Sequence, residues 1–478
     1  MALDRSMFRM YDIRGEVGGE LTAEAARRIG QGFVHMVRQR TGQGSLTVAV
    51  GRDVRPSSQD LAAALIDGIT SQGGSVIDID VVPTPTLYHA LFTLPVEGGI
   101  MITGSHNPPQ YNGFKVAIGR ETLYGDDIQH LADLAEIIHP VTVPVGSVSH
   151  QDHLSAYRDE LVQQFKQGPL GKKGRPRPKV VLDCANGCAG LVVPDLMKKL
   201  GVDAVFMYPE PDGTFPNHHP DPSRLETLEG LRKRVLAEHA DFGVAYDGDV
   251  DRIGAVDERG DVVWGDKLTY IFAADIIAHW QGPGMARVIG EVKCSKTLFD
   301  GVEKLGGFAI MSPTGHSLIK KKMREEKAQL AGEMSGHMFF ADRYYGYDDA
   351  IYATLRLLEI VTGGLGANPT FVFSDLLSAL PPMVASPEIR RPCREEDKDH
   401  LVHGFVDAFR RKFPQMAHTI EKIVTIDGAR IEWADAWGLI RSSNTEPLLV
   451  LRFEAATQER VDQLKKAFDE TLASLVMP

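Results

Sequence analysis

The chain has 478 residues, of which 43% are hydrophobic, so it is too long for one hydrophobic core and predicts about three or four domains. Its formal net charge of −12 would repel a nucleic-acid backbone or an anionic membrane, and we expect neither as a partner. The N-terminus lacks the apolar core of a signal peptide, and no run approaches the ~18 apolar residues of a membrane span, which favours a cytoplasmic location.

Three segments repeat the order of apolar strand, polar loop and helix, at residues 45–74, 179–201 and 287–307. This order indicates parallel sheets joined by crossover helices. Composition breaks at 141–150 and 167–178 and in the glycine-rich 362–369 indicate domain boundaries or long surface loops. After Pro381, a helix near 395–412, alternating strands and a helix at 458–475 predict an α+β domain.

A polar turn, Thr103-Gly-Ser-His-Asn-Pro108, follows the apolar strand GGIMI. It places the hydroxyl of Ser105 at the carboxyl end of a strand, where open α/β sheets bind ligands. The glycine, the asparagine and the two prolines also suit an ordinary turn. A serine-hydrolase elbow is disfavoured, because Pro108 and Pro109 prevent the helix that follows such a nucleophile. We therefore interpret Ser105 as an exposed nucleophile of another kind.

Three aspartates, Asp247, Asp249 and Asp251, alternate between two apolar strands in FGVAYDGDVDRIGAV. Hard oxygen ligands in this arrangement suit Mg²⁺ or Ca²⁺, and carboxylates so concentrated repel one another unless a cation lies among them. A calcium loop needs glycine at its sixth position, where this chain has Arg252. The pattern predicts a magnesium site, with a solvated acidic turn as the alternative.

Three further loops offer groups for a sugar phosphate. Glu333, Ser335 and His337 in GEMSGH could hydrogen-bond sugar hydroxyls, and the segment 441–447 (RSSNTEP) offers a guanidinium and hydroxyls to a phosphate, although a plain hairpin turn is its alternative. Near the N-terminus, YDIRG supplies a phenol and a guanidinium. The sequence contains neither GxxxxGK[ST] nor GxGxxG, so a nucleotide P-loop or a dinucleotide fold is unsupported.

Together and in this order, YDIRG, TGSHNP, DGDVDR, GEMSGH and RSSNTEP resemble the motifs of the α-D-phosphohexomutase family. GEMSGH is similar to the phosphomannomutase/phosphoglucomutase branch, because phosphoglucosamine mutases usually carry Gln where Met334 stands. The resemblance implies four domains around one deep cleft: three α/β domains with mainly parallel mixed sheets and crossover helices, and a C-terminal α+β domain. We expect these domains at residues 1–150, 151–260, 261–370 and 371–478.

The resemblance also implies roles for single residues. Ser105 would be the phosphoserine, and its phosphate would complete a Mg²⁺ site made by the three aspartates. Val250 departs from the family, which usually has Gly or Ala there. The other expected catalytic residues are Arg14, His106, Lys115, Arg252 and His316, with His316, Tyr11, Arg14 and Lys115 as candidates for the general acid/base. Sugar O3 and O4 would be held by Glu333, Ser335 and His337, and the non-reacting phosphate by Arg441, Ser443, Asn444 and Thr445, with Tyr11 also binding substrate.

The implied reaction interconverts hexose 1-phosphate and hexose 6-phosphate, of mannose or glucose, through phospho-Ser105 and a hexose 1,6-bisphosphate. We expect Mg²⁺ as cofactor, glucose 1,6-bisphosphate as activator, hexose phosphates as the only partners, and a monomer or weak homodimer. The alternatives are a phosphoglucosamine mutase of the same family, a sugar phosphatase that uses Ser105, and a non-catalytic binding protein.

Overall fold

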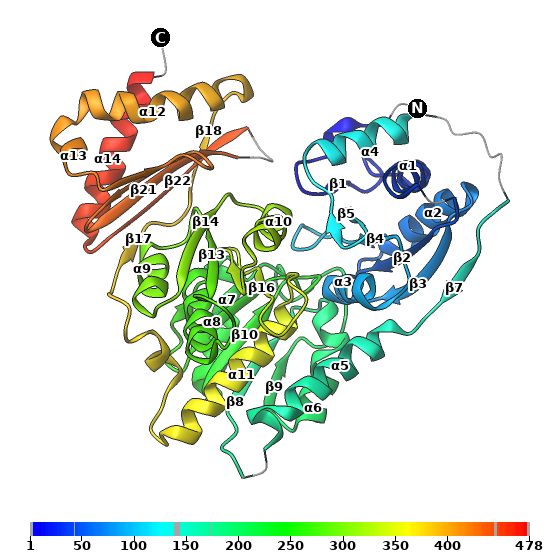
Figure 1. The fold of residues 1–478 in the computed structure, drawn as a ribbon, viewed down its shortest axis with the longest axis horizontal. Coiled ribbons are helices and arrows are strands. Elements are labelled where there is room, and N and C mark those ends of the chain that lie inside the picture. The colour runs from blue at the N-terminus through cyan, green and yellow to red at the C-terminus, as the bar shows by residue number, and fades with distance from the viewer. Residues whose placement is uncertain (1–2, 43, 138–143, 173, 444–446, 476–478) are drawn as a thin grey trace.

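A computed structural model describes the chain except for residues 1–2, 43, 138–143, 173, 444–446 and 476–478. Its strands form four separate sheets, each accompanied by its own helices. In Figure 1 the first domain (blue to cyan) and the fourth (orange to red) lie above the second and third, which are packed together. A single hydrophobic core runs through the second and third domains, whereas the first and fourth each have their own.

The first domain has a mixed sheet of order β1-β5-β4-β2-β3-β7, with β6 paired to β5. Strands β4, β2, β3 and β7 run parallel, while β1, β5 and β6 pair antiparallel. The elements are β1 (Ile13–Glu16), α1 (Ala23–Thr41), β2 (Thr47–Arg52), α2 (Ser58–Ser71), β3 (Ser75–Val81), α3 (Thr84–Thr93), β4 (Gly98–Ile102), β5 (Tyr111–Ile118), β6 (Glu121–Thr122), α4 (Asp126–Glu136) and β7 (Val148–His150).

The second domain has the sheet order β12-β11-β10-β8-β9, parallel from β10 to β9 and antiparallel from β10 to β12. Strands β10 and β11 form a hairpin whose last pair is Tyr246 with Ile253, so the aspartate motif is its connecting loop. The elements are α5 (His153–Gln167), β8 (Lys179–Asp183), α6 (Val193–Leu200), β9 (Asp203–Met207), α7 (Leu225–Glu238), β10 (Phe242–Tyr246), β11 (Ile253–Asp257) and β12 (Val262–Val263).

The third domain has the sheet order β14-β13-β15-β16, in which only the last pair is antiparallel. The GEMSGH loop connects that antiparallel pair. A short loop follows β14, and α10 begins after it at His316. The elements are α8 (Gly265–His279), β13 (Arg287–Glu291), α9 (Lys296–Lys304), β14 (Phe308–Ser312), α10 (His316–Glu326), β15 (Leu330–Gly332), β16 (Met338–Phe340) and α11 (Ala350–Ala367).

Helix α11 corrects one expectation from composition. The glycine-rich segment 362–369 was expected to form a boundary or surface loop, yet α11 continues through most of it to Ala367. Tertiary packing overrides the low helix propensity of glycine here, since a Cβ at Gly364 would lie 2.7 Å from the ring of Phe371. Among the described helices, α11 alone has the length and hydropathy of a membrane span, and 67% of it is buried inside the protein.

The fourth domain has an antiparallel sheet of order β17-β22-β21-β20-β19, with β18 also paired to β22. Helices α12 and α14 pack on it. The elements are β17 (Val384–Ala385), β18 (Ile389–Pro392), α12 (Lys398–Lys412), α13 (Pro414–His418), β19 (Lys422–Val424), β20 (Ala429–Trp433), β21 (Ala436–Ser442), β22 (Leu448–Ala455) and α14 (Gln458–Leu475). The expected fold class, three mixed α/β domains and an α+β domain, is therefore confirmed, while the residue limits of the domains stay predictions.

Candidate active site

Ser105 lies on a strained turn just after β4. Its φ angle of 48° is in the left-handed region, which non-glycine residues seldom adopt and which is common where the backbone serves a site. The backbone N–H of Ser105 donates to Thr103 Oγ1 at 2.8 Å, which holds the turn closed. The residue is only 2% exposed, so the expectation of an exposed nucleophile is wrong: the loop is packed against the second domain.

The hydroxyl of Ser105 reaches across to the aspartate loop of the second domain. Ser105 Oγ donates to Asp247 Oδ2 at 2.8 Å and lies 3.0 Å from His106 Nδ1. A Cβ at Gly248 would come within 2.5 Å of the Ser105 carbonyl oxygen, so only glycine permits this approach of the two loops. Burial, together with the nearby guanidinium groups, lowers the pKa of His106 well below its usual range.

Arg55 anchors the serine loop and was missed by the sequence reasoning. Its Nη1 donates to the carbonyl oxygens of Pro108 (2.7 Å) and Tyr111 (2.9 Å), and its Nη2 to those of Ser105 (2.8 Å) and Asn107 (2.6 Å). The side chain is fully buried and pairs with Asp53 at 3.1 Å. A single guanidinium therefore holds four carbonyl oxygens of the turn that presents Ser105. The only signal for Arg55 in the sequence was its place in the polar loop after the apolar run 46–50.

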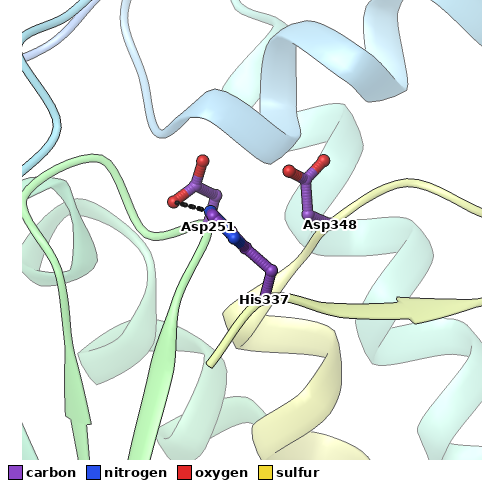
Figure 2. Close-up of side chains that lie close together, drawn as sticks. All are labelled: Asp251, His337 and Asp348. Atoms are coloured by element: carbon purple, nitrogen blue, oxygen red, sulfur yellow. Dashed lines mark ion pairs between the residues drawn. The ribbon is translucent and has the colours of Figure 1, made fainter. Parts of the chain in front are cut away.

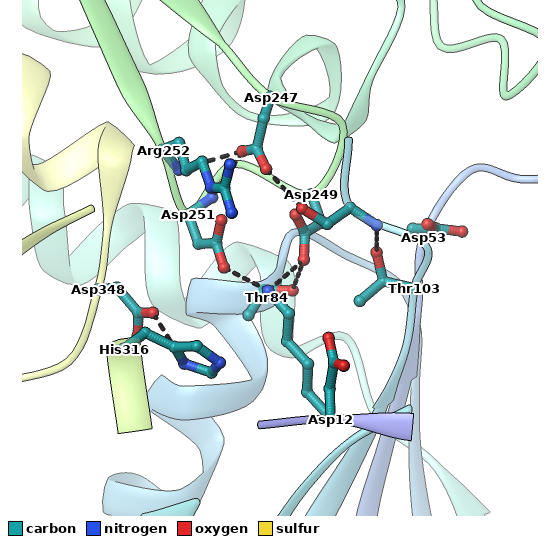
Figure 3. Close-up of polar contacts among 12 residues, drawn as sticks. Asp12, Asp53, Thr84, Thr103, Asp247, Asp249, Asp251, Arg252, His316 and Asp348 are labelled. Carbon is teal, nitrogen blue, oxygen red and sulfur yellow. Dashed lines mark hydrogen bonds and ion pairs between the residues drawn. The ribbon is translucent and has the colours of Figure 1, made fainter. Parts of the chain in front are cut away.

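The three aspartates of the second domain are completely buried and lie together. Their carboxylate oxygens come within 4.8 Å of one another. Thr84 Oγ1 donates to Asp249 Oδ2 at 2.6 Å (Figure 3). The ammonium of Lys115 lies 2.8 Å from the same oxygen and also pairs with Asp251. Within the described residues, Asp249 Oδ1 has no hydrogen-bond partner although it is buried.

The charge state of this cluster is set by burial and by Lys115. Burial raises the pKa of Asp247 well above its ordinary value, and the carboxylates of Asp251 and Asp249 add to the effect. Burial also opposes ionisation of Asp251, but the ammonium of Lys115 and the neighbouring His337 hold its pKa well below the ordinary value. Three carboxylates therefore share a site that the ammonium of Lys115 and the guanidinium of Arg252 only partly neutralise.

This arrangement fits a divalent cation with oxygen ligands. Three buried carboxylates, one with an unpartnered oxygen, are the donor set that Mg²⁺ takes, and a cation would relieve their mutual repulsion. Val250 stands between two of them with a φ of 70°, a conformation that is strained for a β-branched residue and natural for glycine. Its side chain is buried in the hydrophobic core and so occupies none of the space between the carboxylates.

A second group that could hold a metal shares one of these aspartates, namely Asp251 with His337 and Asp348 (Figure 2). In this group Asp348 Oδ1 lies 3.0 Å from Lys320 Nζ. His337 Nε2 lies 3.2 Å from Arg252 Nε. A mixed nitrogen and oxygen set suits Mg²⁺ less well than the three aspartates, whose ligand atoms are all carboxylate oxygens.

The GEMSGH loop folds back on itself around Glu333. Glu333 Oε1 accepts the backbone N–H of Gly315 at 2.8 Å, and His337 Nδ1 donates to Glu333 Oε2 at 2.6 Å. Although burial opposes it, the bond from His337 lowers the pKa of Glu333 to about 2, so this carboxylate is ionised at neutral pH. Ser335 Oγ lies 3.2 Å from the same ring nitrogen. The three polar side chains of this motif are therefore one connected group.

The loop between β14 and α10 links three domains. From the first domain, the hydroxyl of Tyr11 donates to the Thr314 carbonyl at 2.8 Å. The backbone N–H of Thr314 donates to Asp427 Oδ2 of the fourth domain at 3.0 Å. Asp427 Oδ1 in turn accepts from Arg441 Nε at 3.0 Å. Arg441 is thereby brought toward the other motifs, Ser443 follows it at the end of β21, and Asn444 and Thr445 lie outside the described residues.

The remaining candidates flank the serine and the aspartates. Arg14 donates to Asn107 Oδ1 at 2.8 Å, beside Ser105 in the sequence, and also pairs with Asp12. His316 Nδ1 lies 3.5 Å from Asp348 Oδ2, and burial, with Lys320 nearby, lowers its pKa, so the ring is neutral at neutral pH (Figure 3).

The structure thus brings residues of all five motifs into one network, except those outside the described part of the chain. It adds groups that the sequence reasoning did not name: Asp12, Asp53, Arg55, Thr84, Lys320 and Asp348.

Models of four domains of phosphoglucomutase/phosphomannomutase match the chain in order. The alpha/beta/alpha domains I, II and III match residues 5–137, 155–260 and 264–380, and the C-terminal domain matches 388–471. The four matches together cover most of the chain, and each falls on one of the four sheets.

Curated relatives and a solved structure agree with these matches. The chain is 42% identical over 473 residues to a phosphomannomutase/phosphoglucomutase of Pseudomonas aeruginosa, covering 99% of this chain and 96% of that protein. It is 39% identical over 475 residues to a phosphoglucomutase of Neisseria gonorrhoeae, covering 99% and 98%. A phosphoglucomutase/phosphomannomutase family protein of Burkholderia thailandensis has the same fold, with a TM-score of 0.87, 38% identity and 99% and 98% coverage. The chain belongs to the phosphoglucomutase/phosphomannomutase family of the α-D-phosphohexomutases.

Proposed function

We propose that the protein is a phosphohexomutase that interconverts the 1-phosphate and 6-phosphate of mannose, glucose or both, with Ser105 as the phosphoryl carrier. The observation that carries this proposal is the contact between Ser105 Oγ and Asp247 inside a cluster of three buried carboxylates, with Lys115 beside it. Relatives named phosphomannomutase/phosphoglucomutase at about two fifths identity over the full chain support it. They favour this reading over a phosphoglucosamine mutase.

Phosphoryl transfer needs positioning and charge more than covalent help from the protein. In the proposed half-reaction, the bond between phosphorus and Ser105 Oγ breaks as the substrate hydroxyl oxygen bonds to phosphorus. The hydroxyl proton passes to a base, and Ser105 Oγ takes up a proton as it leaves phosphorus. In the second half-reaction Ser105 Oγ gives up that proton as it bonds to the other phosphate, and the released sugar oxygen takes one up. We propose His316 as that base, because the ring is buried and its lowered pKa leaves it neutral and able to accept a proton.

We propose that Asp247, Asp249 and Asp251 hold Mg²⁺, with an oxygen of the seryl phosphate as a further ligand. Bound there, the ion would neutralise the charge that develops on the transferred phosphoryl group. Two solved structures of N-acetylphosphoglucosamine mutase from Aspergillus fumigatus are 14% and 13% identical to this chain. The first is a complex of that enzyme with GlcNAc-6P and magnesium, and the second is a complex of its serine-to-alanine variant with glucose 1,6-bisphosphate.

The proposed binding groups divide between the two ends of the substrate. Glu333, Ser335 and His337 would hydrogen-bond O3 and O4, which glucose and mannose share, so both sugars would be accepted. Arg441, Ser443 and the adjoining Asn444 and Thr445 would hold the phosphate that is not reacting. The 1,6-bisphosphate must then turn so that its other phosphate faces Ser105, and added glucose 1,6-bisphosphate would prime the enzyme. Location in the cytoplasm and a monomer or weak homodimer stay predictions.

Incubation with glucose 1-phosphate or mannose 1-phosphate, Mg²⁺ and a trace of glucose 1,6-bisphosphate tests the proposal by phosphorus NMR. A mutase converts the 1-phosphate to the 6-phosphate and releases no inorganic phosphate, and Ser105→Ala should abolish the conversion. Release of inorganic phosphate would identify a phosphatase. An unchanged spectrum with either sugar would identify a binding protein.

A further inference from the structure

A cavity of about 450 Å³ lies between the first and third domains, and its wall includes Lys320, which also pairs with Asp348. Its walls come from α3 and β6 of the first domain and from α10 and the loop after β16 of the third. This volume is in the range of small-molecule sites.

The walls combine aromatic rings with cations. Tyr88, Phe92, Tyr345 and Tyr347 line the cavity, and the rings of Phe92 and Tyr345 have centroids 4.9 Å apart. The cations are Arg120, Lys320, Arg324 and Lys327. Among the described residues that line the cavity, none is Asp or Glu, although the whole chain has a net charge of −12. Such a wall attracts an anion.

Two of these cations are not neutralised by the protein. Lys320 is paired with Asp348 at 3.0 Å, and Arg324 with Glu121 at 2.9 Å. Arg120 instead lies with its guanidinium 4.7 Å from the ring centre of Phe92, and in the described part of the chain neither it nor Lys327 forms an ion pair with a carboxylate. The available positive charge therefore lies beside the half-buried rings of Phe92 and Tyr345.

We infer that this cavity binds a nucleoside diphosphate, at a site separate from that of the hexose phosphate. The base would stack on the rings of Phe92 and Tyr345, and the phosphates would bind Arg120 and Lys327. Stacking of a base on an aromatic side chain and charge-assisted bonds to phosphate are the interactions these groups make. A ligand there would contact both domains and would therefore favour one arrangement of the two. Because the active site lies between the domains, this would change the affinity for the hexose phosphate.

Titration calorimetry with ADP and with pyrophosphate, in saturating glucose 6-phosphate, tests this inference. We expect ADP to bind with a stoichiometry of about one per chain and at least about tenfold more tightly than pyrophosphate, because stacking of one base is worth roughly that factor. Equal affinity for the two, or displacement of ADP by the sugar phosphate, would overturn the inference. So would the absence of saturable binding up to millimolar ADP.

Single substitutions locate the site. Lys327→Met and Arg120→Met should each weaken ADP binding by about tenfold, since each removes a charged contact to phosphate. Lys322→Met is the matched control. Lys322 lies on the same helix as Lys320 and pairs with Glu326 outside the cavity, so the affinity of this variant for ADP should be unchanged. All three positions are at the surface, so the fold should be retained. ADP binding that is insensitive to Lys327→Met and Arg120→Met would overturn the inference.

Discussion

The role of Arg55 leads to a quantitative prediction for Arg55→Met, a change of similar length that removes the charge. The substitution deletes donors to four backbone carbonyls of residues 105–111 and leaves Asp53, which is 3% exposed, without its cation. Removing one partner of a buried ion pair lowers the free energy of unfolding by about 3–5 kcal/mol. We include the lost hydrogen bonds to the four carbonyls in that figure, because the loop relaxes after the substitution. For a domain of this size the apparent Tm of the first domain should fall by roughly 10 °C.

The four tryptophans of the chain all lie after residue 260, so their fluorescence does not follow the first domain. Scanning calorimetry together with hydrogen exchange of peptides from residues 98–118 measures the effect directly. Arg27→Met is the matched control, because Arg27 lies in the same domain and pairs with Asp67 at the surface, where an ion pair contributes about 0–1 kcal/mol. A Tm and an exchange rate for Arg55→Met equal to those of Arg27→Met would refute the anchoring role.

Three further predictions follow from the site and its surroundings. Asp249→Asn should lower kcat/KM roughly tenfold or more and raise the Mg²⁺ concentration needed, since it removes a charged ligand; an unchanged Mg²⁺ dependence would make the aspartates a simple acidic turn. Glu333→Ala should lower kcat/KM about tenfold or more for both glucose 1-phosphate and mannose 1-phosphate. A loss confined to one sugar would show that this loop contacts the hydroxyl at sugar C2, where glucose and mannose differ. Burial and the adjacent His89 lower the pKa of His153 to about 4 from an ordinary value of about 6.5. The unfolded chain therefore binds the proton first, and the free energy of unfolding should fall as pH drops from about 6.5 to 4. Urea titrations should show a flatter dependence of that free energy on pH for His153→Gln, and an identical dependence would contradict the assignment.

The parts of the site that follow strands could be predicted from the sequence. The turn at Ser105 and the aspartates at 247–251 each come directly after an apolar strand, so both the element and the polar groups at its end are local signals. The strand-loop-helix order likewise predicted the α/β class, because the spacing of apolar residues and the residues that form turns can both be seen within a short segment. The strain at Ser105 and at Val250 could not be seen, since it depends on how two loops pack together.

The residues that the sequence did not reveal act at a distance along the chain. Arg55 binds carbonyls about fifty residues later, Thr84 donates to Asp249 in another domain, and Asp348 faces His316 from a loop after β16. Each is an ordinary polar residue in its own segment and gains significance only from tertiary contacts. The prediction of a boundary or surface loop at residues 362–369 was wrong for a related reason. Tertiary packing around Gly364, and not the low helix propensity of glycine, decides that α11 continues there.

The identity of the phosphoryl carrier is the central claim, and phosphopeptide mapping tests it most directly. The protein would be incubated with glucose 1,6-bisphosphate and Mg²⁺, digested and analysed by mass spectrometry beside Ser105→Ala. We predict one phosphoryl group, on Ser105, that is lost from the peptide when hexose phosphate is added and absent from the variant. Phosphate on any other residue, or full mutase activity in Ser105→Ala, would contradict the account.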